Sequence, residues 1–248
     1  MFTKLSLFSA AIFLMFSFTA CTTQSDSTEA NSSNEQLDDN VLTQEAQQAM
    51  TPEEIIESLK EGNQRFVSNN LTPQDYQAQV EKTSSGQYPE AVVIACIDSR
   101  VPVEAIFDKS VGDIFVARVA GNFVNEDILG STEFGTAVAG SKVVVVMGHE
   151  HCGAVKSAID DVEMGNITAM LSKIRPAVEI SEDDYEGEGE MTSSNDDYVT
   201  HVVNTNVRYT IEQMRERSDI IAELERNGEV VIAGAFYDLD TGVVTFLD

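Results

Sequence analysis

Positive charge is scarce in this chain: 15 Lys and Arg stand against 42 Asp and Glu, so the formal net charge is −27. This balance argues against nucleic acid or anionic lipid as a partner, because both are polyanions. Cysteine is also scarce, and three residues are too few for a disulfide scaffold. Hydrophobic residues still make up 42% of the 248 residues, which excludes wholesale disorder and allows one domain or two small ones.

The apolar stretch near the start of the chain is too short for a transmembrane helix, which needs ~20 apolar residues. It runs over residues 5–18 and follows a single charge, Lys4. Residues 1–20 therefore predict an export signal. The end of this segment, Phe18-Thr19-Ala20-Cys21, resembles a bacterial lipobox, which implies cleavage before Cys21 and lipidation of its thiol. Ordinary secretion, with Cys21 unmodified, is the alternative interpretation.

The segment that follows is polar and acidic and carries no Lys or Arg up to residue 50. Such a composition cannot bury enough apolar surface to offset its ordering entropy, so residues 21–50 predict a flexible acidic tether. The folded domain is then expected over residues 51–248. The predicted location is the cell envelope: a periplasmic lipoprotein that touches a membrane only through its lipid. The outer membrane is favoured, because Thr22 rather than Asp follows the lipidated residue.

Alternating apolar runs and helical patterns predict an α/β fold with a mostly parallel central sheet flanked by helices. Short continuous apolar runs are typical of strands buried on both faces. Thr51, Pro52 and Glu54 form a capping box that predicts the start of a helix. A turn at residues 240–242 predicts a hairpin at the end of the chain. The expected strands cover residues 91–96, 114–117, 142–147, 229–236 and 242–247.

Two of the expected strands end in groups that can bind a metal. Cys96 ends the first strand, and His149 and Cys152 follow the third. Ligands of open α/β sheets bind beyond the carboxyl ends of the strands, so these three side chains are expected to meet. Two thiolates and one imidazole suit Zn²⁺ with a fourth position left open. A disulfide between the two cysteines is the alternative, although it would not need the charged residues beside them.

From about residue 50 to the end, the sequence resembles the β-class carbonic anhydrases. The resemblance implies one Zn²⁺ per subunit, held by Cys96, His149 and Cys152. It implies reversible hydration of carbon dioxide to bicarbonate and a proton, by attack of zinc-bound hydroxide. It also implies a homodimer or a higher homo-oligomer. The matching motifs are Cys96-Ile97-Asp98-Ser99-Arg100-Val101, His149-Glu150-His151-Cys152-Gly153-Ala154 and the segment 112–122 between them, with residues 61–66, 86–89 and 237–242.

The resemblance assigns roles to residues around the metal. Asp98 would orient the reacting water, and Arg100 would hold that carboxylate; in a closed state Asp98 would instead become a fourth zinc ligand. Family closed states depend partly on a bicarbonate pocket that uses Trp, and this chain has no Trp. We therefore expect the open state. Gln87, Phe115 and Gly153 are expected to contact substrate, Gln87 from across a subunit boundary.

Two further positions are less determined by the resemblance. Phe134 stands where many members have Tyr, so a hydroxyl contact is expected to be missing there. His151 could shuttle protons or could simply face solvent.

Three other functions compete with this reading. The first is a zinc-stabilised binding module without catalysis, which predicts damage to Asp98, Arg100 or the ligands. The second is a related lyase or hydrolase on the same fold, such as one acting on carbon disulfide. The third is a redox protein that uses Cys96 and Cys152 as a dithiol, which is disfavoured because neither lies in a Cys-x-x-Cys pair.

Overall fold

A computed structural model describes residues 37–247 of the chain. The predicted export signal, the lipidation site Cys21 and residues 21–36 of the predicted tether lie outside the described residues. None of the helices in the described range combines the length and the apolar character that a membrane crossing requires. The helices are α1 Gln44–Ala49, α2 Pro52–Val67, α3 Tyr76–Thr83, α4 Val103–Ile106, α5 Glu126–Glu133, the π-helix η1 Phe134–Val138, α6 Gly153–Ile159, α7 Gly165–Leu171, α8 Arg175–Asp184, α9 Asp196–Arg217 and α10 Asp219–Arg226.

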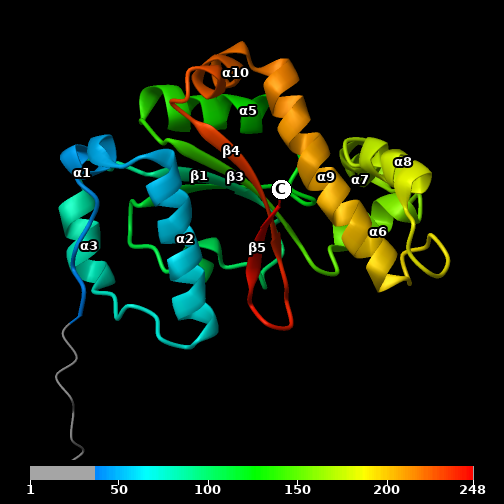
Figure 1. Cartoon of the computed structure of the whole chain (residues 1–248), viewed down its shortest axis with the longest axis horizontal. Helices are drawn as coiled ribbons and strands as arrows, with labels where there is room; N and C mark the ends of the chain where they lie inside the picture. Colours follow the sequence, from blue (N-terminus) through cyan, green and yellow to red (C-terminus); the bar gives the residue numbers. More distant parts are fainter. Residues whose placement is uncertain (1–36, 248) are drawn as a thin grey trace, which may run out of the picture. The chain divides into compact units, whose positions relative to one another are not determined.

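Five strands form one sheet in the order β2-β1-β3-β4-β5 (Figure 1). The first four strands along the sheet are parallel, and β5 pairs with β4 in the antiparallel direction. The prediction of a mostly parallel sheet that ends in a hairpin is thus confirmed. The strands are β1 Ala91–Ala95, β2 Ile114–Arg118, β3 Val143–His149, β4 Val231–Tyr237 and β5 Val244–Leu247.

Both faces of the sheet are covered, which explains why β1 and β3 are continuous apolar runs. On one face, Val93 and Ala95 of β1 pack in a core with Leu59 of α2. On the other face, Ile94 of β1 packs in a core that includes residues of α5, α9 and α10. Figure 1 shows α5, α9 and α10 grouped together, away from α2. The sheet is therefore a rigid platform whose carboxyl edge can hold a site.

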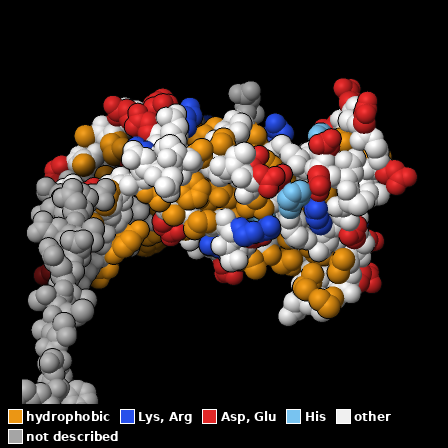
Figure 2. All heavy atoms as spheres, turned by 90° about the horizontal axis from the view of Figure 1, so that it is seen from below, with side chains coloured by type: hydrophobic (Ala, Val, Ile, Leu, Met, Phe, Trp, Pro, Cys, Tyr) orange, Lys and Arg blue, Asp and Glu red, His pale blue; other side chains and the backbone are white. Residues whose placement is uncertain are grey.

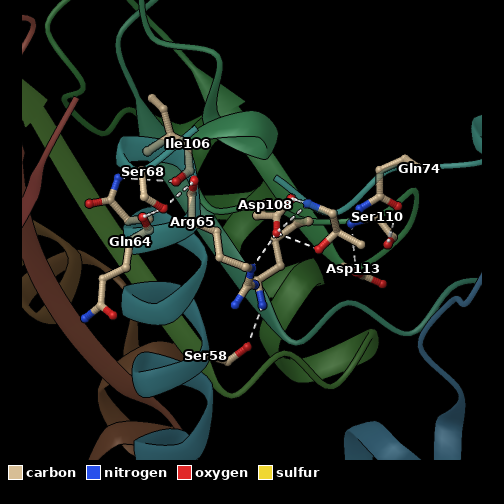
Figure 3. Close-up of polar contacts among 12 residues, drawn as sticks. Ser58, Gln64, Arg65, Ser68, Gln74, Ile106, Asp108, Ser110 and Asp113 are labelled. Atoms are coloured by element: carbon tan, nitrogen blue, oxygen red, sulfur yellow. Dashed lines mark hydrogen bonds and ion pairs between the residues drawn. The ribbon is translucent and has the colours of Figure 1, made fainter. Parts of the chain in front are cut away.

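The amino edge of the sheet is held by a network of charged side chains (Figure 3). Arg65 of α2 donates from Nε to Asp108 Oδ2 over 2.6 Å. Lys109 Nζ lies 2.7 Å from Glu90 Oε1, and both side chains are almost fully buried. Asp113 accepts a hydrogen bond from the backbone N–H of Ser110. Because Glu90 precedes β1 and Asp113 precedes β2, these contacts fix the start of a central strand and of the neighbouring edge strand.

The prediction of a flexible tether up to residue 50 is wrong for the described residues 37–50. Residues 44–49 form α1, which Thr43 caps by accepting from the Ala46 N–H. Gln47 is buried and donates to the carbonyl oxygens of Pro89 (2.8 Å) and Ala139 (2.9 Å). The physical reason is tertiary: these bonds, with those from Lys142 to the carbonyl oxygens of Gln48 and Met50, hold a short polar helix that its own composition would not stabilise.

Candidate metal centre

Three side chains meet at the carboxyl edge of the sheet. Cys96 directly follows β1, His149 is the last residue of β3, and Cys152 is the residue before α6. The parallel register pairs Ala95 with Met147, which places the ends of the two strands side by side. The ligand atoms of Cys96, His149 and Cys152 all lie within 4.8 Å of one another, and all three residues are buried. The predicted meeting of these residues is thus observed.

His149 is prepared to act as a ligand through Nε2. Its Nδ1 lies 2.8 Å from the carbonyl oxygen of Glu150. A carbonyl only accepts, so Nδ1 carries the proton and Nε2 keeps its lone pair. Nε2 is buried and has no hydrogen-bond partner among the described residues. A buried acceptor without a partner is costly in a folded protein, and a metal ion would satisfy it.

The two thiols are unbonded to each other, so the disulfide alternative is not what the structure contains. A hydrogen bond with Cys152 lowers the pKa of Cys96 to about 4, and the backbone N–H of Gly121, 3.3 Å from Sγ, acts in the same direction. The same contact and burial raise the pKa of Cys152. The pair is thus arranged to hold negative charge on sulfur, which is the form that binds metals.

Asp98 lies beside the three ligands and is held by Arg100. Arg100 donates from Nε to Oδ1 (3.0 Å) and from Nη2 to Oδ2 (2.8 Å), and its backbone N–H also reaches Oδ1. These bonds hold the pKa of Asp98 well below its usual range, so the carboxylate stays ionised. Asp98 Oδ2 is 4.0 Å from His149 Nε2, outside the three-ligand cluster. This is the arrangement expected for the open state.

Three residues were predicted to contact substrate. Gly153 lies beside the metal ligands, whereas Phe115 and Gln87 do not. Gly153 begins α6, next to Cys152. Phe115 pairs with Val92, three residues before Ala95, so roughly 10 Å of strand separates it from the ligand end. Gln87 precedes β1 and is exposed, at the opposite edge of the sheet. A single chain therefore does not bring Gln87 or Phe115 to the metal ligands.

Phe115 instead lies beside Phe134, with ring centroids 6.5 Å apart. Both line a cavity of about 660 Å³ between β2 and α5. Phe134 is 56% exposed, which is unusual for a large apolar side chain.

His151 lies on the turn between two ligands but faces outward. Its Nδ1 is 3.2 Å from Asp196 Oδ1 on α9, and its Nε2 is 3.6 Å from Glu150 Oε1. The ring is about one third exposed. This position is compatible with both roles expected from the sequence, a proton shuttle or a residue that simply faces solvent.

Sequence reasoning gave no role to Arg118, Gly121 or Asn206, which support the site from outside. Arg118 donates to the carbonyl oxygens of Cys96 and Asp98. Asn206 of α9 donates to the Gly121 carbonyl over 2.9 Å. The position of the first two could have revealed them: Arg118 is the last residue of β2 and Gly121 follows it, at the same edge of the sheet as Cys96. Nothing in the sequence around Asn206 indicates its contact.

The fold and the donor set define an α/β protein with a Cys₂His metal centre at the carboxyl edge of a parallel sheet. The sequence model of the family described as carbonic anhydrase matches residues 91–244. Carbonic anhydrase 2 of Mycobacterium tuberculosis is 34% identical over 199 residues, which cover 77% of this chain and 90% of that protein. The chain belongs to the carbonic anhydrase family, in its β class.

Solved structures of β-carbonic anhydrases share the fold. The β-carbonic anhydrase CcaA superposes with a TM-score of 0.63 at 24% identity, over 79% of this chain and 94% of that one. A tetrameric β-carbonic anhydrase of Sordaria macrospora gives 0.62 at 24% identity, over 67% of this chain and 84% of that one. The zinc that this family uses fits the residues present, because two thiols and an unpartnered imidazole nitrogen converge in a buried site.

Proposed function

We propose that this chain is a zinc enzyme that reversibly hydrates carbon dioxide to bicarbonate and a proton. The observation that carries the proposal is the convergence of Cys96, His149 and Cys152 with the ionised, Arg-held carboxylate of Asp98 beside them. These three residues would hold Zn²⁺. When bound, the ion supplies a Lewis acid that lets water ionise near neutral pH.

Asp98 orients the reacting water by accepting its hydrogen bond. Because Arg100 keeps the pKa of Asp98 low, the carboxylate accepts hydrogen bonds at neutral pH without taking up a proton. Arg100 is therefore a positioning residue: its paired bonds to Oδ1 and Oδ2 fix the plane of the carboxylate. Glu150 acts similarly on the imidazole, since its carbonyl fixes the ring of His149.

We further propose that the active form is a homodimer or a larger homo-oligomer, in which a partner subunit supplies Gln87 and Phe115. Supporting this, β2 is an edge strand, Phe134 beside it is 56% exposed, and Val138 of η1 is 71% exposed. The related Sordaria macrospora protein is described as tetrameric. The mass of the zinc-loaded protein in solution, measured by light scattering, tests this; a monomer would contradict it.

We also propose that the protein is exported and lipidated on Cys21, and so attached to the outer membrane from the periplasmic side. The support is sequence alone: the apolar stretch, the small residues before Cys21 and the polar segment after it. Metabolic labelling with a fatty acid, comparing the full chain with its Cys21→Ser variant, is the test. Equal labelling of both would contradict lipidation at this residue.

The activity is tested by titrating metal-free protein with Zn²⁺ while measuring carbon dioxide hydration, for the wild type and for Asp98→Ala. We expect one equivalent of zinc in both, and a rate about 10–100-fold lower in the variant, because the orienting carboxylate is gone. Glu223→Ala, which removes an exposed carboxylate from α10, is the control and should match the wild type. Stoichiometric zinc without hydration above background would favour a non-catalytic zinc module.

A further inference from the structure

A cavity of about 270 Å³ lies on the face of α9, away from the proposed substrate residues. Tyr209, Thr210 and Arg217 of α9 form one wall. Lys173, just after α7, forms a second wall, and the segment at residues 123–124 forms a third. Neither Lys173 nor Arg217 is one of the metal ligands.

The charge of this cavity is opposite to that of the molecule. Its walls contain two cations and no carboxylate, in a chain of net charge −27. Figure 2 shows how common acidic side chains are on one face of the molecule and how few basic ones it carries. Within residues 37–247, neither Lys173 nor Arg217 has a carboxylate oxygen within 4.0 Å, whereas nearby cations such as Lys156 and Arg215 are paired.

One of the two cations also has hydrogen-bond donors that are not in use. Arg217 uses Nη1 to reach the carbonyl oxygen of Val124 (3.2 Å), and no other bond of its guanidinium is formed in the described part of the chain. Gln213, which also lines the cavity, donates to Glu216 over 2.9 Å.

We propose that this cavity binds a small dianionic oxyanion, of the chemical class of inorganic phosphate and sulfate. Two exposed cations without ion pairs match two negative charges, and the unused donors of Arg217 can bond further oxygens of the anion. This site is separate from the metal centre and does not depend on carbonic anhydrase activity.

The test is calorimetric titration of zinc-loaded protein with inorganic phosphate, against chloride at equal ionic strength. We expect saturable binding whose dissociation constant rises about tenfold in Lys173→Gln, since one charge-assisted hydrogen bond is lost. Arg217→Gln should also weaken binding, because it removes the second positive charge of the cavity. Arg208→Gln is the matched control: it removes one exposed positive charge from the same helix, outside the cavity, and should bind like the wild type.

Each result decides the proposal. Weakening in both cavity variants with an unchanged control supports it. Absence of saturable binding to the wild type overturns it. Equal weakening in Arg208→Gln would indicate a diffuse charge effect and would also overturn it. Binding that survives both Lys173→Gln and Arg217→Gln would place the phosphate outside this cavity, again against the proposal. Circular dichroism of each variant confirms that it is folded.

Discussion

At the scale of single residues, Gly121 shows how tightly the second layer of the metal centre is packed. Its φ is +83°, and a Cβ there would lie 2.4 Å from Ile174 Cδ1. We expect Gly121→Ala to lower the free energy of unfolding by about 2–4 kcal/mol, from left-handed strain and overpacking. Urea unfolding of the zinc-loaded protein, followed by circular dichroism, measures this.

Gly130→Ala is the matched control for that experiment. Gly130 lies inside α5, and a Cβ there would meet nothing within 4 Å. The substitution should raise the free energy of unfolding by about 0.5–1 kcal/mol, because alanine loses less backbone entropy in a helix. Equal stabilities of the two alanine variants would show that the conformation of Gly121 does not matter.

The buried carboxyl of Asp113 should make the stability of the folded protein depend on pH. Burial raises its pKa above the usual value, so the folded state favours the neutral form. Such a group contributes stability at low pH, and that contribution is lost as pH rises through its pKa in the folded state. In Asp113→Asn this loss is absent. We therefore expect the variant to gain stability relative to the wild type between pH 4 and neutral pH, measured by urea unfolding across that range.

If Asp113→Asn instead lost stability relative to the wild type as the pH rises over this range, the interpretation of Asp113 would be wrong. A constant difference at all pH values would mean that only its hydrogen bonds, to the N–H groups of Ser110 and Leu42, matter. Burial raises the pKa of Glu90 as well, and the charge of Asp113 adds to this shift, so Asp113→Asn also removes part of the pH dependence that Glu90 contributes, with the same sign.

At the scale of elements, the strands and the metal ligands could be predicted, whereas α1 could not. The strands β1 and β3 are apolar because both sheet faces are covered, so their ends, and with them Cys96 and His149, follow from local pattern. In contrast, α1 has no apolar face: its sequence is Gln-Glu-Ala-Gln-Gln-Ala, and its contacts come from residues far along the chain. Gln87 and Phe115 could be named by resemblance, but no pattern within one chain places them at the metal.

Gln47 is the buried side chain of α1, and together with Lys142, which donates to the carbonyl oxygens of Gln48 and Met50, it attaches the helix to the rest of the fold. Gln47→Ala removes two hydrogen bonds to buried carbonyl oxygens, so we expect the free energy of unfolding to fall by about 1–3 kcal/mol. Gln48→Ala is the control, because that neighbouring side chain is exposed and alanine suits a helix. Thermal unfolding compares the two. A Gln47→Ala variant as stable as Gln48→Ala would mean that the two hydrogen bonds of Gln47 do not contribute to stability.

At the scale of the whole molecule, the metal centre joins parts of the chain that are otherwise distant. Its ligands directly follow β1, end β3 and directly precede α6, so a bound ion would restrain all three elements at once. A ligand that binds only the folded state stabilises it by about 4 kcal/mol at a free concentration 1,000 times its dissociation constant. The stability of this protein should therefore depend on its metal.

We expect a chelator to lower the melting temperature of the zinc-loaded protein by roughly 10 °C, and to abolish carbon dioxide hydration in parallel. Added Zn²⁺ should restore both, whereas Mg²⁺ should restore neither, since thiolates are poor ligands for hard ions. Cys152→Ala lacks one ligand and should show little change with chelator. A full melting shift in that variant would place the stabilising ion elsewhere, and an unshifted wild type would mean that the fold does not need the ion at all.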